Sequence, residues 1–228
     1  MKPEISIIIP ALNEADSIRE TLDALAGFEN AEIILVDGGS TDATVAIAQI
    51  YDVKILHAPR RGRGLQLQTG ADSGNAGILW FVHADTTVPP DAVEQIKTVL
   101  ERGGVAGGNF SIRFDGARRA ARFLSWLYPN LRKLGLIYGD SAIFVRRSVY
   151  EKIGGFRDYP IFEDLDFVER LKKEGEIVTL SSVVTTSSRR FENKSFTLVF
   201  LRWTILQILY WLGVSPHKLV KIYFPASK

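Results

Sequence analysis

Two acidic motifs about eighty residues apart carry the side chains best suited to chemistry. His83, Ala84 and Asp85 follow an apolar run, and Glu163 and Asp164 stand at the predicted start of a helix. A carboxylate of the first motif can hold a divalent cation against a diphosphate, and a carboxylate of the second can accept a proton from a hydroxyl. This division of labour suits group transfer from an activated donor.

The first motif offers few ligands for a metal. Asp85 supplies one carboxylate, whereas Mg²⁺ and Mn²⁺ are usually held by one or two carboxylates together with substrate phosphates and water. Because side chains alternate along a strand, residues 83 and 85 are predicted to point to the same side. His83 has three open roles: ligation of Mn²⁺, a hydrogen bond to a phosphate or to Asp85, and simple packing.

Two further polar clusters follow apolar runs. The first run ends in Pro10, Ala11, Leu12, Asn13 and Glu14, and the second in Asp37, Gly38, Gly39, Ser40, Thr41 and Asp42. Ligands of an open parallel sheet bind beyond the carboxyl ends of its strands, so we expect these clusters and Asp85 to face one crevice. Asp37 is expected to accept a hydrogen bond from a base or a ribose hydroxyl. Each cluster is, alternatively, a turn that caps a helix.

The glycine-rich stretches do not match the standard nucleotide-binding loops. No G-x-G-x-x-G spacing follows the first strand, and the stretch from Arg60 to Gly64 lacks the Gly-Lys-Ser/Thr ending of a P-loop. A nicotinamide enzyme is therefore disfavoured. Arg63 and Gly64 retain two interpretations, a flexible cationic loop near phosphates and an ordinary solvated loop.

The elements that must position these motifs are short strands alternating with helices. Strands are predicted at 5–9, 32–36, 53–56 and 78–82, and helices after Ser17, after 40–42 and after 89–91. This alternation is typical of a parallel sheet covered on both faces. Further along, strands predicted at 109–114 and 141–145 flank a helix from about 117 to 133. The predicted fold class is α/β.

Composition narrows the class of protein. Hydrophobic residues make up 46% and charged residues 24% of the chain, which is ordinary for a globular protein and disfavours disorder. The absence of cysteine excludes disulfides and thiol catalysis and fits a reducing compartment. The first strand begins at Ile5 with no secretion signal before it, so we expect a cytoplasmic location.

The C-terminal part is both basic and apolar. From Ser181 onward, seven Lys or Arg against one acid give a charge of +6, which leaves −4 for the rest of a chain whose net charge is +2. The run from Phe196 to Val214 is mainly apolar, but Arg202 within it would cost about 2.5–3.5 kcal/mol in a membrane span. We expect an interfacial helix on anionic lipid or against a partner, with burial on the protein's own core as the alternative.

Four motifs in order make the chain resemble the family 2 glycosyltransferases of the small bacterial, membrane-associated type. The motifs are residues 6–14, 36–42, 83–85 and 162–164, and the likeness spans about residues 5–180. The resemblance implies the GT-A nucleotide-diphospho-sugar transferase fold, a Rossmann-like mixed sheet with helices on both faces. We therefore expect a GT-A domain over residues 1–190 and a C-terminal apolar and basic helical appendage over residues 191–228.

The resemblance also implies roles for individual residues. Asp164 would be the general base that deprotonates an acceptor hydroxyl, with Glu163 beside it, and attack would invert the anomeric centre. Asp85 would hold Mg²⁺ or Mn²⁺ against the diphosphate. The nucleotide, most often uridine, would be bound by Pro10, Ala11, Asn13, Glu14, Asp37, Gly39, Arg63, Gly64, His83 and Ala84.

One departure from the family pattern concerns the metal, because His83 stands where the usual element has its first aspartate. The identity of the cation and its affinity without nucleotide are therefore open. Residues 139–145 resemble a subset of small bacterial members, which makes Asp140 a candidate contact for an acceptor or a bound sugar, or else a turn residue. Arg189 and Arg190 are candidates for contact with the diphosphate or an anionic acceptor, or else a membrane-facing pair.

The sequence thus predicts a hexosyltransferase-like enzyme at the membrane surface. It would move one sugar from a nucleotide-diphosphate donor, UDP-linked, to a hydroxyl of a lipid-like or small acceptor. No nucleic-acid partner is expected, and the apolar C-terminal helix is also a candidate surface for a homodimer. The alternatives are a non-catalytic sugar-nucleotide sensor at the membrane and a nucleotidyltransferase, which would release pyrophosphate.

Overall fold

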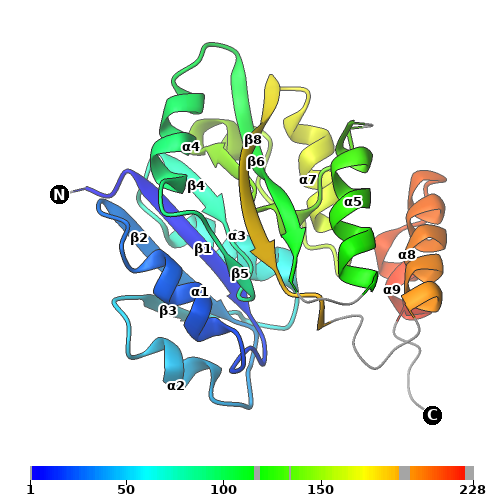
Figure 1. The fold of residues 1–228 in the computed structure, drawn as a ribbon, viewed down its shortest axis with the longest axis horizontal. Coiled ribbons are helices and arrows are strands. Elements are labelled where there is room, and N and C mark those ends of the chain that lie inside the picture. The colour runs from blue at the N-terminus through cyan, green and yellow to red at the C-terminus, as the bar shows by residue number, and fades with distance from the viewer. Residues whose placement is uncertain (1, 116–118, 134, 190–195, 224–228) are drawn as a thin grey trace.

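A single sheet of eight strands organises the protein. The computed structural model describes residues 2–115, 119–133, 135–189 and 196–223. The strands lie in the order β3-β2-β1-β4-β7-β6-β8-β5 (Figure 1). Their bounds are β1 (Ile5–Ala11), β2 (Ala31–Asp37), β3 (Lys54–His57), β4 (Ile78–Phe81), β5 (Thr86–Thr87), β6 (Val105–Phe114), β7 (Phe144–Arg146) and β8 (Glu176–Thr186).

The sheet is parallel in its first half and mixed in its second. β1 pairs in parallel with β2 and with β4, and β2 pairs in parallel with β3. The carboxyl ends of these four strands therefore lie along one edge, as the alternating pattern predicted. β7 is antiparallel to β4 and β6, β8 is parallel to β6, and β5 is antiparallel to β8.

Helices cover both faces of the sheet. They are α1 (Ile18–Leu25), α2 (Thr44–Ala48), α3 (Arg63–Ser73), α4 (Ala92–Leu100), α5 (Arg119–Lys133), α6 (Arg147–Lys152), α7 (Glu163–Leu171), α8 (Phe196–Trp211) and α9 (Pro216–Tyr223). Ile5, Ile7 and Ile9 of β1 belong to one buried cluster with α1, α2, α4 and α5, whereas Ile8 belongs to another with α3, α6 and α7. This two-sided burial explains why β1 is apolar throughout.

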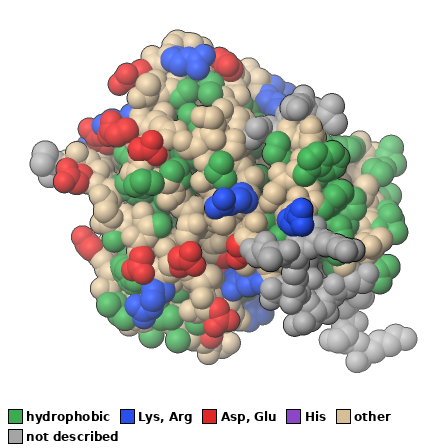
Figure 2. All heavy atoms as spheres, viewed as in Figure 1, with side chains coloured by type: hydrophobic (Ala, Val, Ile, Leu, Met, Phe, Trp, Pro, Cys, Tyr) green, Lys and Arg blue, Asp and Glu red, His purple; other side chains and the backbone are tan. Residues whose placement is uncertain are grey.

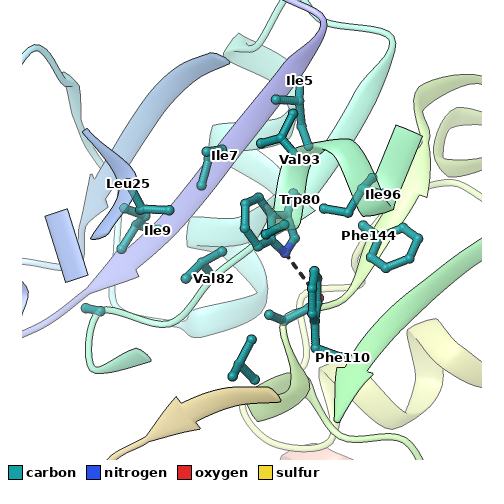
Figure 3. Packing of buried hydrophobic residues seen from close by; sticks show 14 of the residues in the cluster. Ile5, Ile7, Ile9, Leu25, Trp80, Val82, Val93, Ile96, Phe110 and Phe144 are labelled. Carbon is teal, nitrogen blue, oxygen red and sulfur yellow. Dashed lines mark hydrogen bonds between the residues drawn. The ribbon is translucent and has the colours of Figure 1, made fainter. Parts of the chain in front are cut away.

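A tryptophan in the core holds the turn that precedes β7. Trp80 of β4 is fully buried, and its ring centroid lies 5.6 Å from that of Phe110 (Figure 3). Its indole Nε1 donates a hydrogen bond of 3.2 Å to the carbonyl oxygen of Ala142. Ala142 directly follows a 3₁₀ turn at Gly139–Ser141. The core therefore holds this turn beside the end of β4.

The predicted elements agree with the structure apart from their ends and two details. Arg63 and Gly64, for which a loop was predicted, form the first residues of α3. β7 begins at Phe144 and not at residue 141, because residues 139–141 form the 3₁₀ turn and Ala142 has a φ of 52°, which a strand residue does not adopt. Ser17 directly precedes α1, but its side chain does not cap the helix. Its hydroxyl instead donates to the Glu14 carboxylate at 3.1 Å.

The two C-terminal helices pack on the loop that precedes α7. The ring of Phe162 lies 5.6 Å from that of Trp203 and 5.1 Å from that of Tyr210, both on α8. Leu206 of α8 and Leu219 of α9 are buried in the same cluster. One side of α8 thus packs on the protein itself. In the part of the chain that the structure describes, no helix has both the length and the apolarity to cross a membrane.

Candidate active site

The loops after β1 and β2 are hydrogen-bonded to each other. The amide of Asn13 donates to Ser40 Oγ at 2.9 Å, and its side-chain oxygen accepts from the amide of Thr41 at 2.8 Å. The amide of Glu14 donates to Thr44 Oγ1 at 2.7 Å. The two polar clusters that the sequence singled out therefore form one continuous wall at the carboxyl ends of β1 and β2.

Asp37 supports this wall from within. It is buried, and its carboxylate accepts hydrogen bonds of 3.0 Å from the amides of Gly39 and Ser40. Burial raises the pKa of Asp37, but hydrogen bonds from Ser40, Gly39 and His57 outweigh burial and hold the pKa below its ordinary value. Asp37 is therefore an ionised carboxylate that fixes its own loop.

Three apolar candidates for nucleotide binding also have their side chains in the interior. Pro10 and Ala11 belong to β1, which is buried along its whole length, and Ala84 is buried as well. The carbonyl oxygens of Ala11 and Val36 both accept hydrogen bonds of 2.8 Å from the buried amide of Gln66 on α3. Sequence reasoning missed Gln66, because one amide in a helix carries no motif.

His83 and Asp85 line one cavity of about 300 Å³. β4 ends at Phe81 and residues 84–85 form a turn, so the strand alternation used to place the two side chains does not apply, although they do face one space. Glu14, Asp140 and Arg189 line the same cavity. The end of β4, the end of β1 and the end of β8 therefore meet here.

Arg189 supplies positive charge to this cavity. Its guanidinium pairs with Glu14 and lies 3.6 Å from Asp85 Oδ2. Asp85 Oδ1 also accepts a hydrogen bond of 3.4 Å from Thr186. Partial burial lowers the pKa of Arg189, but an arginine stays charged at neutral pH. The other predicted arginine, Arg190, lies outside the described residues.

The donor set around Asp85 fits a cation that arrives with a phosphate ligand. Asp85 offers one carboxylate, and His83 Nδ1 lies 3.1 Å from Asp140 Oδ1. Among the residues that the structure describes, no group of three or more His, Cys, Asp or Glu is arranged to hold a metal ion. Mg²⁺ commonly takes one or two carboxylates and completes its shell with substrate phosphates and water.

Asp164 lies in the first turn of α7. It is 8% exposed, and its Oδ2 accepts a hydrogen bond of 2.8 Å from the amide of Gly139. The neighbouring Glu163 is buried and pairs with Arg63, whose Nη2 lies 4.0 Å from Asp164 Oδ2. Burial alone lowers the pKa of Arg63, but the charges of Glu163, Asp164 and Asp140 raise it above its ordinary value.

Two glycines allow the motifs to approach one another. A Cβ on Gly139 would lie 3.2 Å from Asp164 Oδ2 and 3.4 Å from His83 Nε2, so the two acidic motifs meet at this residue. A Cβ on Gly64 would lie 2.6 Å from the carbonyl oxygen of Arg157 and 3.2 Å from Glu163 Cβ. Gly64 therefore has a packing role, which brings α3 against the start of α7.

Unusual backbone angles occur beside the candidate side chains. Asn13, Ala142 and Phe162 have φ values of 56°, 52° and 62°. Residues other than glycine rarely adopt this left-handed region, and holding one there costs on the order of 1–3 kcal/mol. Such strain is common at functional sites, because the surrounding structure must enforce it.

A second cavity adjoins the first. It has a volume of about 420 Å³, and Asp164 and Arg63 belong to its lining. Tyr128 and Asp140 line both cavities. The two remote motifs of the sequence therefore occupy neighbouring spaces, one rich in charge and one with largely apolar walls contributed by α5 and α8.

Known proteins share this sequence pattern. The model of the family "Glycosyl transferase family 2" matches residues 6–154. The PGL/p-HBAD biosynthesis glycosyltransferase of Mycobacterium bovis is 31% identical over 217 residues, which cover 86% of this chain and 81% of that protein. YdaM of Bacillus subtilis is 28% identical over 200 residues, which cover 76% of this chain but only 47% of YdaM. This chain thus spans about half the length of that relative.

Solved structures share the fold. S. aureus TarS 1–349 in complex with UDP-GlcNAc superimposes with a TM-score of 0.65 at 17% identity, over 85% of this chain and 60% of that one. Glucosyl-3-phosphoglycerate synthase from Mycobacterium tuberculosis, with Mn²⁺ and UDP, gives a TM-score of 0.64 at 20% identity over 93% and 81%. The mixed sheet is that of the GT-A fold. Since the family model covers more than half of the chain, the protein belongs to the family 2 glycosyltransferases, enzymes that transfer sugars.

Proposed function

We propose that the protein is an inverting glycosyltransferase that moves one sugar from a UDP-linked donor to a hydroxyl of a lipid-like or small acceptor. One observation carries the proposal: Asp164 lies in a cavity that adjoins the charged cavity of Asp85 and shares Asp140 with it. A proton acceptor and a site for a diphosphate are thus neighbours. Inverting transfer needs this arrangement, because the nucleophile and the leaving group occupy opposite sides of the anomeric carbon.

The transfer step assigns Asp164 the role of general base. The acceptor oxygen forms a bond to the anomeric carbon while the bond from that carbon to the diphosphate oxygen breaks. The electron pair of the broken bond leaves with the nucleoside diphosphate, and the hydroxyl proton passes to Asp164. The hydrogen bond from the Gly139 amide, 2.8 Å long, holds the carboxylate in place. Glu163 acts through Arg63, which it fixes beside Asp164.

The charged cavity is assigned to the donor. The wall formed by residues 10–14 and 37–40 binds the nucleoside, and Arg189 offers charge to the diphosphate. Two of the solved relatives hold uridine compounds, which supports UDP as the nucleotide. Asp85 is the residue that would hold Mg²⁺ or Mn²⁺, and this cation would offset charge on the departing diphosphate. His83, held by Asp140, faces the same diphosphate.

The C-terminal helices are assigned to an anionic membrane surface. Leu198, Leu201 and Ile205 recur at helical spacing on α8 and are exposed, and Leu212, just after the helix, is exposed as well. Figure 2 shows hydrophobic side chains gathered on the side of the molecule formed by these helices. Exposed lysines at 218 and 221 on α9 add positive charge. An apolar helix face with basic flanks is typical of peripheral binding at the cytoplasmic leaflet.

We also propose that residues 1–190 are the transferase domain and that residues 191–228 form a helical appendage that attaches it to the membrane. The appendage contributes to the site as well, because α8 lines the cavity of Asp164. This division makes a small protein both a catalyst and its own membrane anchor. A homodimer through the exposed face of α8 would compete with membrane attachment for the same residues.

The proposed function is tested with nucleotides and nucleotide sugars. UDP and UDP-sugars should raise the melting temperature in the presence of Mn²⁺, because a ligand that binds only the folded state stabilises it by mass action. Release of UDP with a suitable acceptor would support the transferase. Release of pyrophosphate would identify a nucleotidyltransferase, and binding without turnover across a broad acceptor panel would identify a sensor. Stabilisation by GDP compounds alone would overturn the assignment of the donor.

A further inference from the structure

The cavity beside Asp164 is built as a slot between two helices. Leu124, Leu127 and Leu131 line it from α5, and Phe200, Trp203 and Ile208 line it from α8. The α5 set is spaced by three, four and seven residues, and Trp203 and Ile208 stand three and eight residues after Phe200, so each set lies on one face of its helix. The two helices lie side by side (Figure 1), and the ring of Phe123 on α5 contacts those of Phe196 and Phe200 at 5.7 and 5.9 Å.

The slot has few polar groups, and two of them are hydrogen-bonded to each other. Tyr138 donates a hydrogen bond of 3.0 Å to the side-chain oxygen of Gln207. Burial raises the pKa of Tyr138, and Asp164 and Asp140 raise it further against the effect of that hydrogen bond, so the phenol keeps its proton and remains the donor. Tyr138 also directly precedes Gly139, whose amide binds Asp164. The polar groups thus lie together near the proposed base.

One donor in this group is unused. The amide nitrogen of Gln207 is buried and has no hydrogen-bond partner among the described residues. A buried donor without a partner is costly, and native structures normally satisfy it with protein, water or a ligand. Since Tyr138 fixes the amide oxygen and Gln207 lines the cavity, the unpartnered nitrogen lies at the wall of the slot.

We infer that the slot binds the acceptor, and that the acceptor carries a hydrocarbon segment. The hydrocarbon lies between α5 and α8, the reacting hydroxyl lies at Asp164, and a second oxygen of the acceptor accepts a hydrogen bond from Gln207. A volume of about 420 Å³ is within the usual range for small-molecule sites, about 300–1,000 Å³. The inference rests on the proposed function and narrows its acceptor from a lipid-like or small molecule to an amphiphile.

Physical chemistry favours an amphiphile over a free sugar. A water-soluble sugar in this slot would place hydroxyls against leucine and phenylalanine side chains, where they lose hydrogen bonds to water without replacement. A hydrocarbon chain in the same place gains about 25 cal/mol for each Å² of apolar surface removed from water. The few polar groups then select the orientation of the head.

The fluorescence of the protein's own tryptophans can report binding in the slot. Trp203 and Trp211 line the slot, whereas Trp80 is buried in the core and Trp126 is exposed on α5. A decyl β-glucoside with a bromine on its alkyl chain, used below its critical micelle concentration, should quench tryptophan fluorescence saturably. Methyl β-glucoside has the same sugar head but no alkyl chain. It should neither bind the protein nor displace the brominated glucoside. No saturable quenching, or equal binding of the two glucosides, would overturn the inference.

Matched variants separate the slot from the exposed face of α8. Leu127→Phe narrows the slot, Gln207→Leu removes the amide, and Leu198→Phe makes the same change as the first on an exposed position outside the slot. We expect affinity for the brominated glucoside to fall about tenfold in the first two variants and to stay unchanged in the third, since one lost buried hydrogen bond or a filled site is worth about a factor of ten. If Leu198→Phe weakens binding and Leu127→Phe does not, the probe binds the outer face and the inference fails.

UDP binding and the unfolding midpoint are measured on the same protein preparations. These measurements separate a failure of the proposed function from a failure of the inference about the acceptor. If UDP fails to bind the wild-type protein, the proposed function fails regardless of the glucoside. If UDP binds normally and the glucoside does not, only the inference about the acceptor fails. If Leu127→Phe lowers the unfolding midpoint, the test of the slot relies on Gln207→Leu instead. This substitution changes the polarity of the side chain with little change in its volume.

Discussion

The backbone amide of Gly139 donates a hydrogen bond of 2.8 Å to Oδ2 of Asp164. This contact joins the 3₁₀ turn before β7 to the first turn of α7. The amide of Leu165 donates a second hydrogen bond, of 2.9 Å, to Oδ1, so both oxygens of this carboxylate are held where it lines the slot. The next residue of the turn, Asp140, lies 3.1 Å from His83 Nδ1. Asp164 and His83 are therefore held by two consecutive residues, so a disturbance of either acidic motif is expected to reach the other.

Asp164→Asn tests the general base directly. Asparagine keeps the shape and can still accept from Gly139 but cannot take a proton, so we expect turnover to fall by about 10²–10⁴-fold with UDP affinity unchanged. Steady-state release of UDP and calorimetric binding of UDP measure the two quantities. The control is Glu169→Gln, which neutralises an exposed carboxylate on the same helix. Near wild-type turnover in Asp164→Asn would exclude this residue as the base.

The pair of Arg63 and Glu163 should stabilise the fold as well as the site. Glu163 is 1% exposed and pairs with Arg63, so Arg63→Met leaves a buried carboxylate without its partner. We expect the free energy of unfolding to fall by about 1–3 kcal/mol. Glu163→Gln in the same chain removes the stranded charge and should restore part of the loss. Urea unfolding of the single and double variants forms the cycle, and strictly additive losses would show that the pair is not coupled.

Stability should depend on pH through Asp37. The folded-state pKa of Asp37 is lower than its ordinary value of 3.8, so its contribution is fully present above pH 3.8 and is lost as the pH falls through the lower folded pKa. Asp37→Asn should therefore be less stable than the wild type near neutral pH, and the difference should shrink in strongly acidic solution. Urea midpoints across this range measure it. A difference that stays constant with pH would assign the effect of the substitution to shape and not to charge.

The fold and the order of the motifs could be predicted from the sequence because both are local patterns. Apolar runs such as that from Ile5 to Ile9 fix strands, and the polar residues after them mark one edge of a parallel sheet. What escaped prediction depends on contacts between distant residues. Gln66 ties together two strand ends, and the slot lined by Leu127 and Gln207 exists only once α5 and α8 lie side by side. Gln207 could be noticed in the sequence only as a single amide side chain within the apolar run from Phe196 to Val214.

The placement of His83 shows a correct expectation with a wrong reason. Strand alternation was used to put His83 and Asp85 on one side, but the strand ends at Phe81 and a turn brings the two residues to the same cavity. Turn geometry of this kind follows from tertiary contacts, among them the hydrogen bond of 3.0 Å from Thr21 Oγ1 to the carbonyl oxygen of Ala84. Residue spacing alone does not contain that information.

Asp85 should couple nucleotide binding to a divalent cation. In the wild type, Mn²⁺ is expected to increase affinity for UDP, because Asp85 would hold the cation and the cation would offset charge on the diphosphate. Asp85→Asn should abolish most of this increase while leaving the affinity measured with a chelator little changed or higher, since Arg189 lies 3.6 Å from Asp85 and is freed to bind phosphate. Calorimetry with Mn²⁺ and with chelator measures both values. Asp52→Asn, an exposed position remote from the site, is the control.

An unchanged effect of Mn²⁺ in Asp85→Asn would show that the cation is held by other groups. In that case, His83→Phe would be the next variant to examine, because His83 lines the same cavity. An effect of Mn²⁺ that is absent from the wild type as well would instead assign the diphosphate to Arg189 alone.

Membrane attachment should depend on the exposed face of α8. Leu201 and Ile205 are about half exposed and do not line the slot, so their replacement together by serine leaves the acceptor site intact. We expect binding to vesicles containing anionic lipid to fall by about tenfold or more, since each buried apolar side chain contributes about 1.5–3 kcal/mol. Co-sedimentation with vesicles measures it. Ile50→Ser is the matched control, because Ile50 is 70% exposed just after α2, at the opposite end of the molecule from α8 (Figure 1).

The basic residues of α9 give this prediction a second, independent signature. If Lys218 and Lys221 contact the lipid headgroups, binding should weaken as salt is added and should vanish on neutral vesicles, because the attraction between exposed charges is screened over about 10 Å at 0.1 M salt. A loss of binding in the serine variant without any dependence on anionic lipid would point to a hydrophobic partner and not to the membrane. Sedimentation equilibrium of the wild type without vesicles then decides whether that partner is a second copy of this chain.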